Sequence, residues 1–197
     1  MSIGTEGPKP EEADSVQSLA VPDRAATVRS AMTGDRAAIQ AVGAAAGERF
    51  RSIEDPRVAR CADDPPLSLE ALSRYVRGGR AWVALVGDEV VGFAVADPLD
   101  GGAHLEEVAV RPEHEGRGIG SDLLRLVEGW AASAGLDGVT LTTFRDVPWN
   151  RPFYERRGFV VVPDEELTLG LVARREDEAA HGLDPELRVV MRRRGSR

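Results

Sequence analysis

The sequence predicts one domain of the α/β (α+β) class, built around a mixed sheet. The chain has 197 residues, of which 42% are hydrophobic and 29% charged, a balance that can bury one sizeable core. Helix-like and strand-like patterns follow one another without an internal repeat or linker. A hairpin pattern in the middle of the chain is followed by a further strand and a glycine-rich turn into an amphipathic helix.

The two ends of the chain differ in composition from the segment between them. Residues 1–24 contain Pro, Glu, Ser and Gly without a period, and they lack aromatic side chains, which predicts a disordered tail. The folded domain is expected over residues 25–194. Residues 195–197 are expected to form a short C-terminal tail.

The first part of the domain predicts a strand, a helix, a loop and a second helix. Thr27–Arg29 is a short strand-like run, and apolar residues recur at helical spacing over residues 35–50. Residues 54–67 are polar and interrupted by prolines, which predicts a loop. Ser68 is a suitable N-cap for a helix that ends at the glycine pair 78–79.

The clearest pattern is a hairpin. The apolar runs 81–86 and 90–95 flank Gly87-Asp88-Glu89, a connection of hairpin length that contains glycine. A third strand is expected at roughly residues 104–110, after the turn at Gly101-Gly102.

The remaining elements alternate between helices and strands. The segment from Ile119 to Ala134 has an apolar helical face, and Gly135 is expected to end that helix. The elements expected after it are a strand over residues 138–143, a short helix closed by Gly158, a strand over 159–162, a helix over about 164–181 and a strand over 188–192.

Charge and cysteine content exclude several classes of protein. The formal charge of −8 argues against a protein whose main task is to bind nucleic-acid phosphates. The single cysteine, Cys61, excludes a disulfide framework and a multi-cysteine zinc site, and we expect no metal. No apolar run is long enough to span a membrane, and the acidic start does not resemble a secretion signal. We therefore expect a soluble, cytoplasmic protein without nucleic-acid or membrane partners.

The strongest local motif is the glycine-rich segment from Glu115 to Ser121, between a predicted strand and a predicted helix. Three alternating glycines leave the backbone bare, so a ligand can approach the main-chain amides closely. The first turn of the following helix adds unpaired N–H groups and the positive end of its dipole. This combination suits a phosphate or pyrophosphate, and the alternative interpretation is a simple glycine-rich turn.

Two familiar phosphate-binding motifs do not fit this segment. A Walker A loop needs Gly-Lys-Ser/Thr, which is absent from the sequence. The dinucleotide motif needs a sixth-position glycine, but Ser121 occupies that place counted from Gly116, and Leu123 counted from Gly118. A nucleotide-binding protein with an unusual loop stays open as a minor alternative.

The stretch LEEVAVRPEHEGRGIGSDLL resembles the acetyl-CoA-binding motif of the GCN5-related N-acetyltransferases (GNAT family). That motif, Gln/Arg-x-x-Gly-x-Gly/Ala, aligns with Glu115, Gly118 and Gly120. A second stretch, TFRDVPWNRPFYERRGF, is similar to a later motif of the family. The resemblance extends from about Thr27 to the C-terminus and implies a mostly antiparallel mixed sheet with a splayed pair of parallel strands and helices on both faces.

The resemblance also implies where acetyl-CoA is bound. The cofactor arm would pair with the main chain at Val108, Ala109 and Val110, in the gap between the splayed strands. The family usually has Gln or Arg at the position of Glu115, and a carboxylate beside a pyrophosphate costs Coulomb energy, which Arg117 could offset. The pyrophosphate would lie on the segment made of Glu115, Gly116, Arg117, Gly118, Ile119, Gly120 and Ser121, and Asn150 would either bind the cofactor or cap the next helix.

For the chemistry, the resemblance assigns a general acid and leaves the base open. Tyr154 occupies the position of the family's tyrosine, which protonates or hydrogen-bonds the departing thiolate. Glu106 is the preferred base, with His104 next. In a regular strand these two side chains share a face and Glu107 opposes them, although a bulge would change that parity.

The expected function is acetyl-CoA-dependent transfer of acetyl to a primary amine of a small molecule or peptide. A non-catalytic acyl-CoA-binding or sensor domain of the same fold is the alternative. The acceptor amine is not identified by the sequence. Dimers are frequent among relatives, which makes a homodimer an expectation by analogy only.

Overall fold

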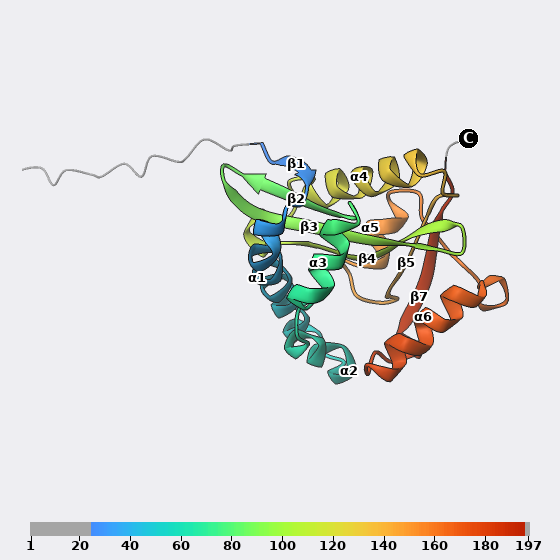
Figure 1. The fold of residues 1–197 in the computed structure, drawn as a ribbon. Coiled ribbons are helices and arrows are strands. Elements are labelled where there is room, and N and C mark those ends of the chain that lie inside the picture. The colour runs from blue at the N-terminus through green and yellow to red at the C-terminus, as the bar shows by residue number, and fades with distance from the viewer. Residues whose placement is uncertain (1–24, 196–197) are drawn as a thin grey trace, which may run out of the picture.

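A seven-stranded mixed sheet lies at the centre of residues 25–195, the part of the chain that the computed structural model describes (Figure 1). Its order is β1-β2-β3-β4-β5-β7-β6, and every neighbouring pair is antiparallel except β4 and β5. The strands are β1 (Thr27–Ser30), β2 (Ala81–Val86), β3 (Glu89–Leu99), β4 (Gly102–Val110), β5 (Val139–Phe144), β6 (Val160–Val161) and β7 (Arg188–Arg193).

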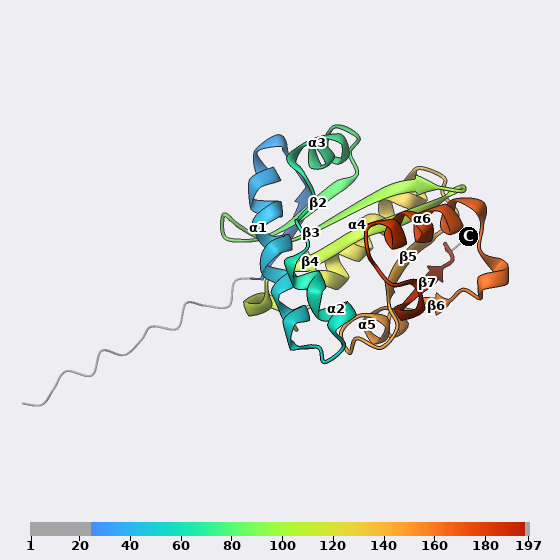
Figure 2. The ribbon, with the colours of Figure 1, turned by 90° about the horizontal axis from the view of Figure 1, so that it is seen from below.

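Helices cover both faces of this sheet. On one face, α4 (Ile119–Ser133) packs with β4 and β5 in one apolar cluster, and the short helix α5 (Arg151–Glu155) joins it through Tyr154. On the other face, α1 (Arg36–Gly47) and α3 (Leu69–Arg77) pack on β2 and β3. Figure 2 shows α1, α3 and α6 (Leu169–Ala180) on the side opposite α4. The predicted class, the mixed sheet and the two helical layers are confirmed.

The parallel strands β4 and β5 separate soon after they meet. They pair only over residues 103–105 with residues 139–141. Beyond that point β4 continues beside β3, while β5 continues beside β7. The edge of β4 that faces β5 therefore has no strand partner over residues 106–110, and its backbone groups are available to a ligand.

A β-bulge accompanies this separation. Val95 of β3 pairs with Glu107 and Ala96 pairs with Leu105, so Glu106 is the extra residue on β4. Leu105 and Val108 consequently pack against the same apolar cluster, although strict alternation would place them on opposite faces.

Two predicted segments are different in the structure. Residues 54–67 are not only a loop, because α2 (Pro56–Ala59) forms there with Asp55 as N-cap and proline in its first turn. The helix expected over 164–181 begins only at Leu169, after a separate 3-10 turn and an extended Leu167. Its first turn is capped by Asp100, whose carboxylate accepts a hydrogen bond from Gly170 N at 2.9 Å.

The predicted tail 1–24 lies outside the described residues, as do residues 196 and 197 of the predicted C-terminal tail. Within residues 25–195, no helix combines the length and the apolar character that crossing a bilayer requires.

Candidate active site

A cavity of about 760 Å³ lies where β4 and β5 separate. Its wall is made by α1 and the turns that follow it, the glycine-rich segment, and the connection from β5 to α5. Among the predicted site residues, all but His104 and Arg117 line it: Glu106, Val108, Ala109, Val110, Glu115, Gly116, Gly118, Ile119, Gly120, Ser121, Asn150 and Tyr154. Three segments distant in sequence are thereby brought to one site.

The glycine-rich segment presents bare backbone amides to this cavity. Gly116 and Gly118 have φ angles of +74° and +85°, which only glycine adopts without strain, and Gly118 is the N-cap of α4. Among residues 25–195, no backbone carbonyl accepts a hydrogen bond from the N–H groups of Gly116, Gly118, Ile119 and Gly120. The amide of Ser121, also expected to hold phosphate, donates to the Gly118 carbonyl at 2.9 Å.

Arg157 is a site residue that the sequence analysis did not single out. Its Nε lies 2.9 Å from Ser121 Oγ, its Nη1 donates to the Phe153 carbonyl at 2.6 Å, and its guanidinium stacks 3.5 Å from the centroid of the Phe153 ring. Burial lowers the pKa of this arginine, which nevertheless stays charged. It brings positive charge from the turn after α5 to the start of α4, where an anion is expected.

Tyr154 lies between an aromatic cluster and the cavity. Its ring makes edge contacts with Phe153 and Phe159, at centroid distances of 5.1 and 5.7 Å. Burial raises the pKa of its phenol, so the hydroxyl stays protonated at any physiological pH. The side chain therefore combines packing with the presentation of a hydrogen-bond donor.

Asn150 lies at the start of α5, where the sequence left two roles open. Its side chain makes no capping hydrogen bond to that helix, and it lines the cavity.

The three candidate bases have different surroundings. His104 is 1% exposed, its Nδ1 lies 3.0 Å from Thr140 Oγ1, and burial lowers its pKa to about 4. Glu106 lines the cavity but forms an ion pair with Arg174 of α6 at 2.7 Å. Glu107 also lines the cavity, and burial raises its pKa to about 7. Burial raises the pKa of Glu106 as well, so the two carboxyl groups differ chiefly in the ion pair of Glu106. The bulge at Glu106 changes the parity of Glu107, whose side chain also reaches the cavity.

Residues 48–159 match the sequence model of the acetyltransferase (GNAT) family, which covers more than half of the chain. The chain belongs to this family. Acetyl-CoA is the cosubstrate of GNAT enzymes, and the glycine-rich segment and the free edge of β4 are the features that the family resemblance assigns to binding it.

Comparisons with individual proteins agree with this membership. A mycothiol acetyltransferase from Nocardiopsis dassonvillei is 40% identical over 87 residues, which is 41% of this chain but 26% of that enzyme. This chain therefore matches about a quarter of the length of that curated relative.

Two solved structures are similar over most of this chain. The PaiA N-acetyltransferase of Thermoplasma acidophilum, crystallised with coenzyme A, has a TM-score of 0.64 at 15% identity over 86% of this chain and 98% of that one. A GNAT acetyltransferase from Staphylococcus aureus Mu50 has a TM-score of 0.64 at 17% identity, over 87% of this chain and 100% of that one. These two structures share the GNAT fold.

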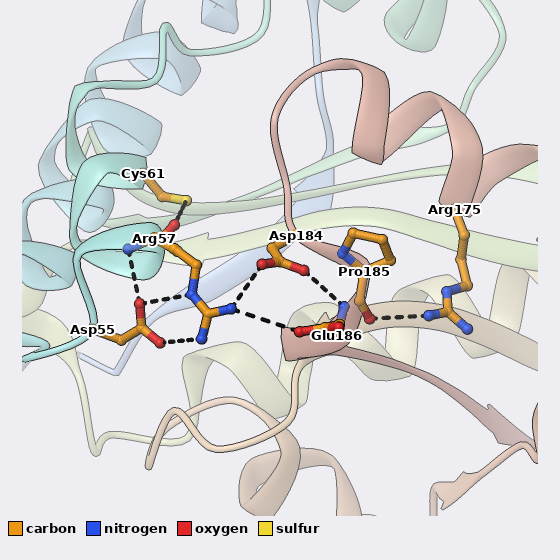
Figure 3. A network of polar contacts seen from close by, with 7 residues as sticks. All are labelled: Asp55, Arg57, Cys61, Arg175, Asp184, Pro185 and Glu186. Carbon is orange, nitrogen blue, oxygen red and sulfur yellow. Dashed lines mark hydrogen bonds and ion pairs between the residues drawn. The ribbon is translucent and has the colours of Figure 1, made fainter.

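Arg57 of α2 joins the start of its own helix to the turn before β7 (Figure 3). The guanidinium pairs with Asp55, the N-cap residue of α2. It also forms ion pairs with Asp184 at 2.9 Å and with Glu186 at 3.8 Å, in the turn before β7. Cys61 and Leu183 line the cavity from the two segments that this bridge joins. Burial raises the pKa of the Cys61 thiol to about 11, so it stays unreactive at neutral pH.

Within residues 25–195, no group of three or more His, Cys, Asp or Glu side chains is placed to hold a metal ion.

Proposed function

We propose that this protein is an N-acetyltransferase that transfers acetyl directly from acetyl-CoA to a primary amine of a small molecule or peptide, with Tyr154 as general acid. The observation that supports this most strongly is that one cavity contains the unpartnered edge of β4, the bare amides of the glycine-rich segment, and the Tyr154 hydroxyl-bearing side chain. In acetyl-CoA, the β4 edge would pair with the amide-rich pantetheine arm, the backbone amides with the pyrophosphate, and Tyr154 with the thioester.

The binding of acetyl-CoA follows from the hydrogen-bonding groups that the cavity offers. The main chain at Val108, Ala109 and Val110 pairs with the pantetheine amides as an added strand would. The pyrophosphate accepts hydrogen bonds from the amides at the start of α4 and benefits from its helix dipole. Arg157, anchored on Ser121, adds positive charge beside these amides.

The proposed reaction requires one base and one acid. The acceptor ammonium first loses a proton to Glu107, directly or through water, and the neutral nitrogen attacks the thioester carbonyl carbon. The new C–N bond forms as the C–S bond breaks, and the phenol of Tyr154 donates a hydrogen bond and its proton to the departing sulfur. The acylated nitrogen then loses its second proton, directly or through water, to the Tyr154 phenolate, which restores the phenol, and Glu107 passes its own proton to solvent.

A thiol-release assay tests this proposal. Purified protein is incubated with acetyl-CoA and a panel of amines, and free coenzyme A is measured with a thiol reagent. Release that depends on both the protein and an amine supports the transferase. Binding of acetyl-CoA without release on any amine would favour the non-catalytic sensor domain. Tight ATP or NAD binding in place of acetyl-CoA would favour a nucleotide-binding protein.

Gly118→Ala should weaken acetyl-CoA binding. A side chain at φ +85° costs about 1–2 kcal/mol, and relaxation of this strain would re-aim the amides of the loop. Titration calorimetry should show a loss of about tenfold or more in affinity, in line with the loss of one or more hydrogen bonds to a charged group. Gly129→Ala in the middle of α4 is the matched control, because a Cβ there also meets no atom within 4 Å. Equal affinities of both variants would contradict this role of the loop.

Arg57→Ala should change the choice of acceptor without changing the affinity for acetyl-CoA. The bridge to Asp184 and Glu186 restrains two segments that line the cavity, which favours small amines over peptides. The variant should therefore increase the ratio of kcat/KM for a peptide to kcat/KM for a small amine by about fivefold or more. A fivefold change corresponds to a difference of about 1 kcal/mol in transition-state binding between the two acceptors. Arg74→Ala, an exposed arginine on α3, is the control. An unchanged acceptor profile would show that the bridge does not restrict access.

A further inference from the structure

Glu115 places a carboxylate at the part of the cavity where the proposed function requires a diphosphate. The family motif has Gln or Arg at this position, and Glu115 lines the cavity together with Gly116 and Gly118. Two like charges at contact distance repel each other, more strongly away from bulk water. The site therefore needs compensating positive charge close to Glu115.

Arg49 brings such a charge from a distant segment. It lies in the 3-10 turn that follows α1, 66 residues before Glu115, and its Nη1 forms an ion pair with Glu115 Oε1. Both residues line the cavity. Their side chains are 29% and 34% exposed, so a ligand can reach them.

Aromatic packing fixes the plane of the Arg49 guanidinium. Its Cζ lies 4.0 Å from the centroid of the Trp149 ring. Trp149 in turn packs against Phe50 at 5.9 Å, and Phe50 packs against Phe144 at the end of β5 at 5.6 Å. A stacked guanidinium that donates one N–H group to Glu115 keeps further donors in the same plane.

We infer that Arg49 binds the phosphate groups of acetyl-CoA, and that Glu115 is a positioning residue that holds the Arg49 guanidinium at the glycine-rich segment. This inference rests on the proposed function, because it requires acetyl-CoA in this cavity. It assigns to Arg49 the positive charge that an arginine at position 115 would supply. Glu115 then anchors a phosphate-binding guanidinium from a distant segment instead of contacting the phosphate itself.

Calorimetric titration of acetyl-CoA into the full-length protein tests this assignment. Arg49→Met should weaken binding by about 10- to 100-fold, the range expected for a charge-assisted contact. The affinity of Arg49→Met should also fall less steeply with added salt than that of the wild type. Arg49→Lys should retain more affinity than Arg49→Met, because it keeps the charge. Arg51→Met is the matched control, since Arg51 pairs with Glu48 and Asp63 and does not line the cavity.

A second substitution separates direct phosphate binding from simple neutralisation of Glu115. In the Arg49→Met background, Glu115→Gln should restore part of the lost affinity, because it removes an uncompensated carboxylate. The double variant should nevertheless stay about fivefold or more weaker than Glu115→Gln alone, as for a lost contact to phosphate. Equal affinities of these two variants, or no loss in Arg49→Met, would overturn the inference. Failure of the wild type to bind acetyl-CoA would instead contradict the proposed function itself.

Discussion

Tyr154→Phe is expected to lower kcat by about 100-fold or more while the affinity for acetyl-CoA stays within about threefold of the wild type. The substitution removes only the hydroxyl group. The ring contacts with Phe153 and Phe159 are retained, so α5 and its packing should persist. Because burial keeps the phenol protonated, the wild type has this donor available over the whole working pH range. Stopped-time thiol-release assays and calorimetry measure the two quantities separately.

The matched control for this experiment is Tyr75→Phe, which removes the chain's other tyrosine hydroxyl, on α3 and not part of the cavity lining. It should leave kcat and acetyl-CoA affinity unchanged. An active Tyr154→Phe enzyme with normal kcat would show that the departing thiolate obtains its proton elsewhere. A variant that fails to bind acetyl-CoA but melts like the wild type would assign Tyr154 to binding rather than to chemistry.

Glu107→Gln is expected to lower kcat by about 100- to 1,000-fold, because amide nitrogen and oxygen cannot accept the proton of the acceptor ammonium at neutral pH. For the wild type, activity should rise with pH through a value of about 7, where the carboxylate of Glu107 becomes ionised. This rise should be absent from the residual activity of Glu107→Gln. The measurement is kcat/KM between about pH 5 and pH 9 for both proteins.

Two further variants decide between the candidate bases. Glu106→Gln and His104→Gln should each retain the rise near pH 7, because Glu106 is paired with Arg174 and His104 is buried beside Thr140. Loss of that rise in Glu106→Gln, with its retention in Glu107→Gln, would return the role of base to Glu106.

The stability of Glu107→Gln provides an independent check on the same carboxyl group. Its folded-state pKa of about 7 lies above the unfolded value near 4.5, so the folded protein loses stability as pH rises through 7. Glutamine removes that dependence. The variant should therefore gain in melting temperature relative to the wild type above pH 7 and show little difference at pH 4.

Local patterns in the sequence predicted most of the fold. Ser68 accepts the capping hydrogen bond from Ala71 N at 3.1 Å that its position before an apolar helical pattern indicates. The hairpin of β2 and β3, and the helix α4 that begins beside the glycine-rich segment, also depend on residues close in sequence. Short-range signals of this kind are sufficient because turns, caps and periodic apolar faces act within a few residues.

The features that the sequence did not reveal depend on contacts between distant residues. The cap of α6 by Asp100 spans 70 residues, and the bridge from Arg57 to Asp184 spans 127. The bulge that brings Glu107 into the cavity is a property of how β4 pairs with β3, and its position cannot be read from alternation along one strand. Most of the residues that the family resemblance assigns to cofactor binding line the cavity, and most of these lie in consecutive positions around Gly118.

A crystal structure of the wild type with coenzyme A tests the proposed binding site. Diphosphate oxygens are expected about 3 Å from the amides of Gly116 and of residues 118–120, the pantetheine arm along β4, and the sulfur within hydrogen-bonding reach of the Tyr154 hydroxyl. Coenzyme A bound at any other place, or a sulfur atom remote from Tyr154, would contradict it.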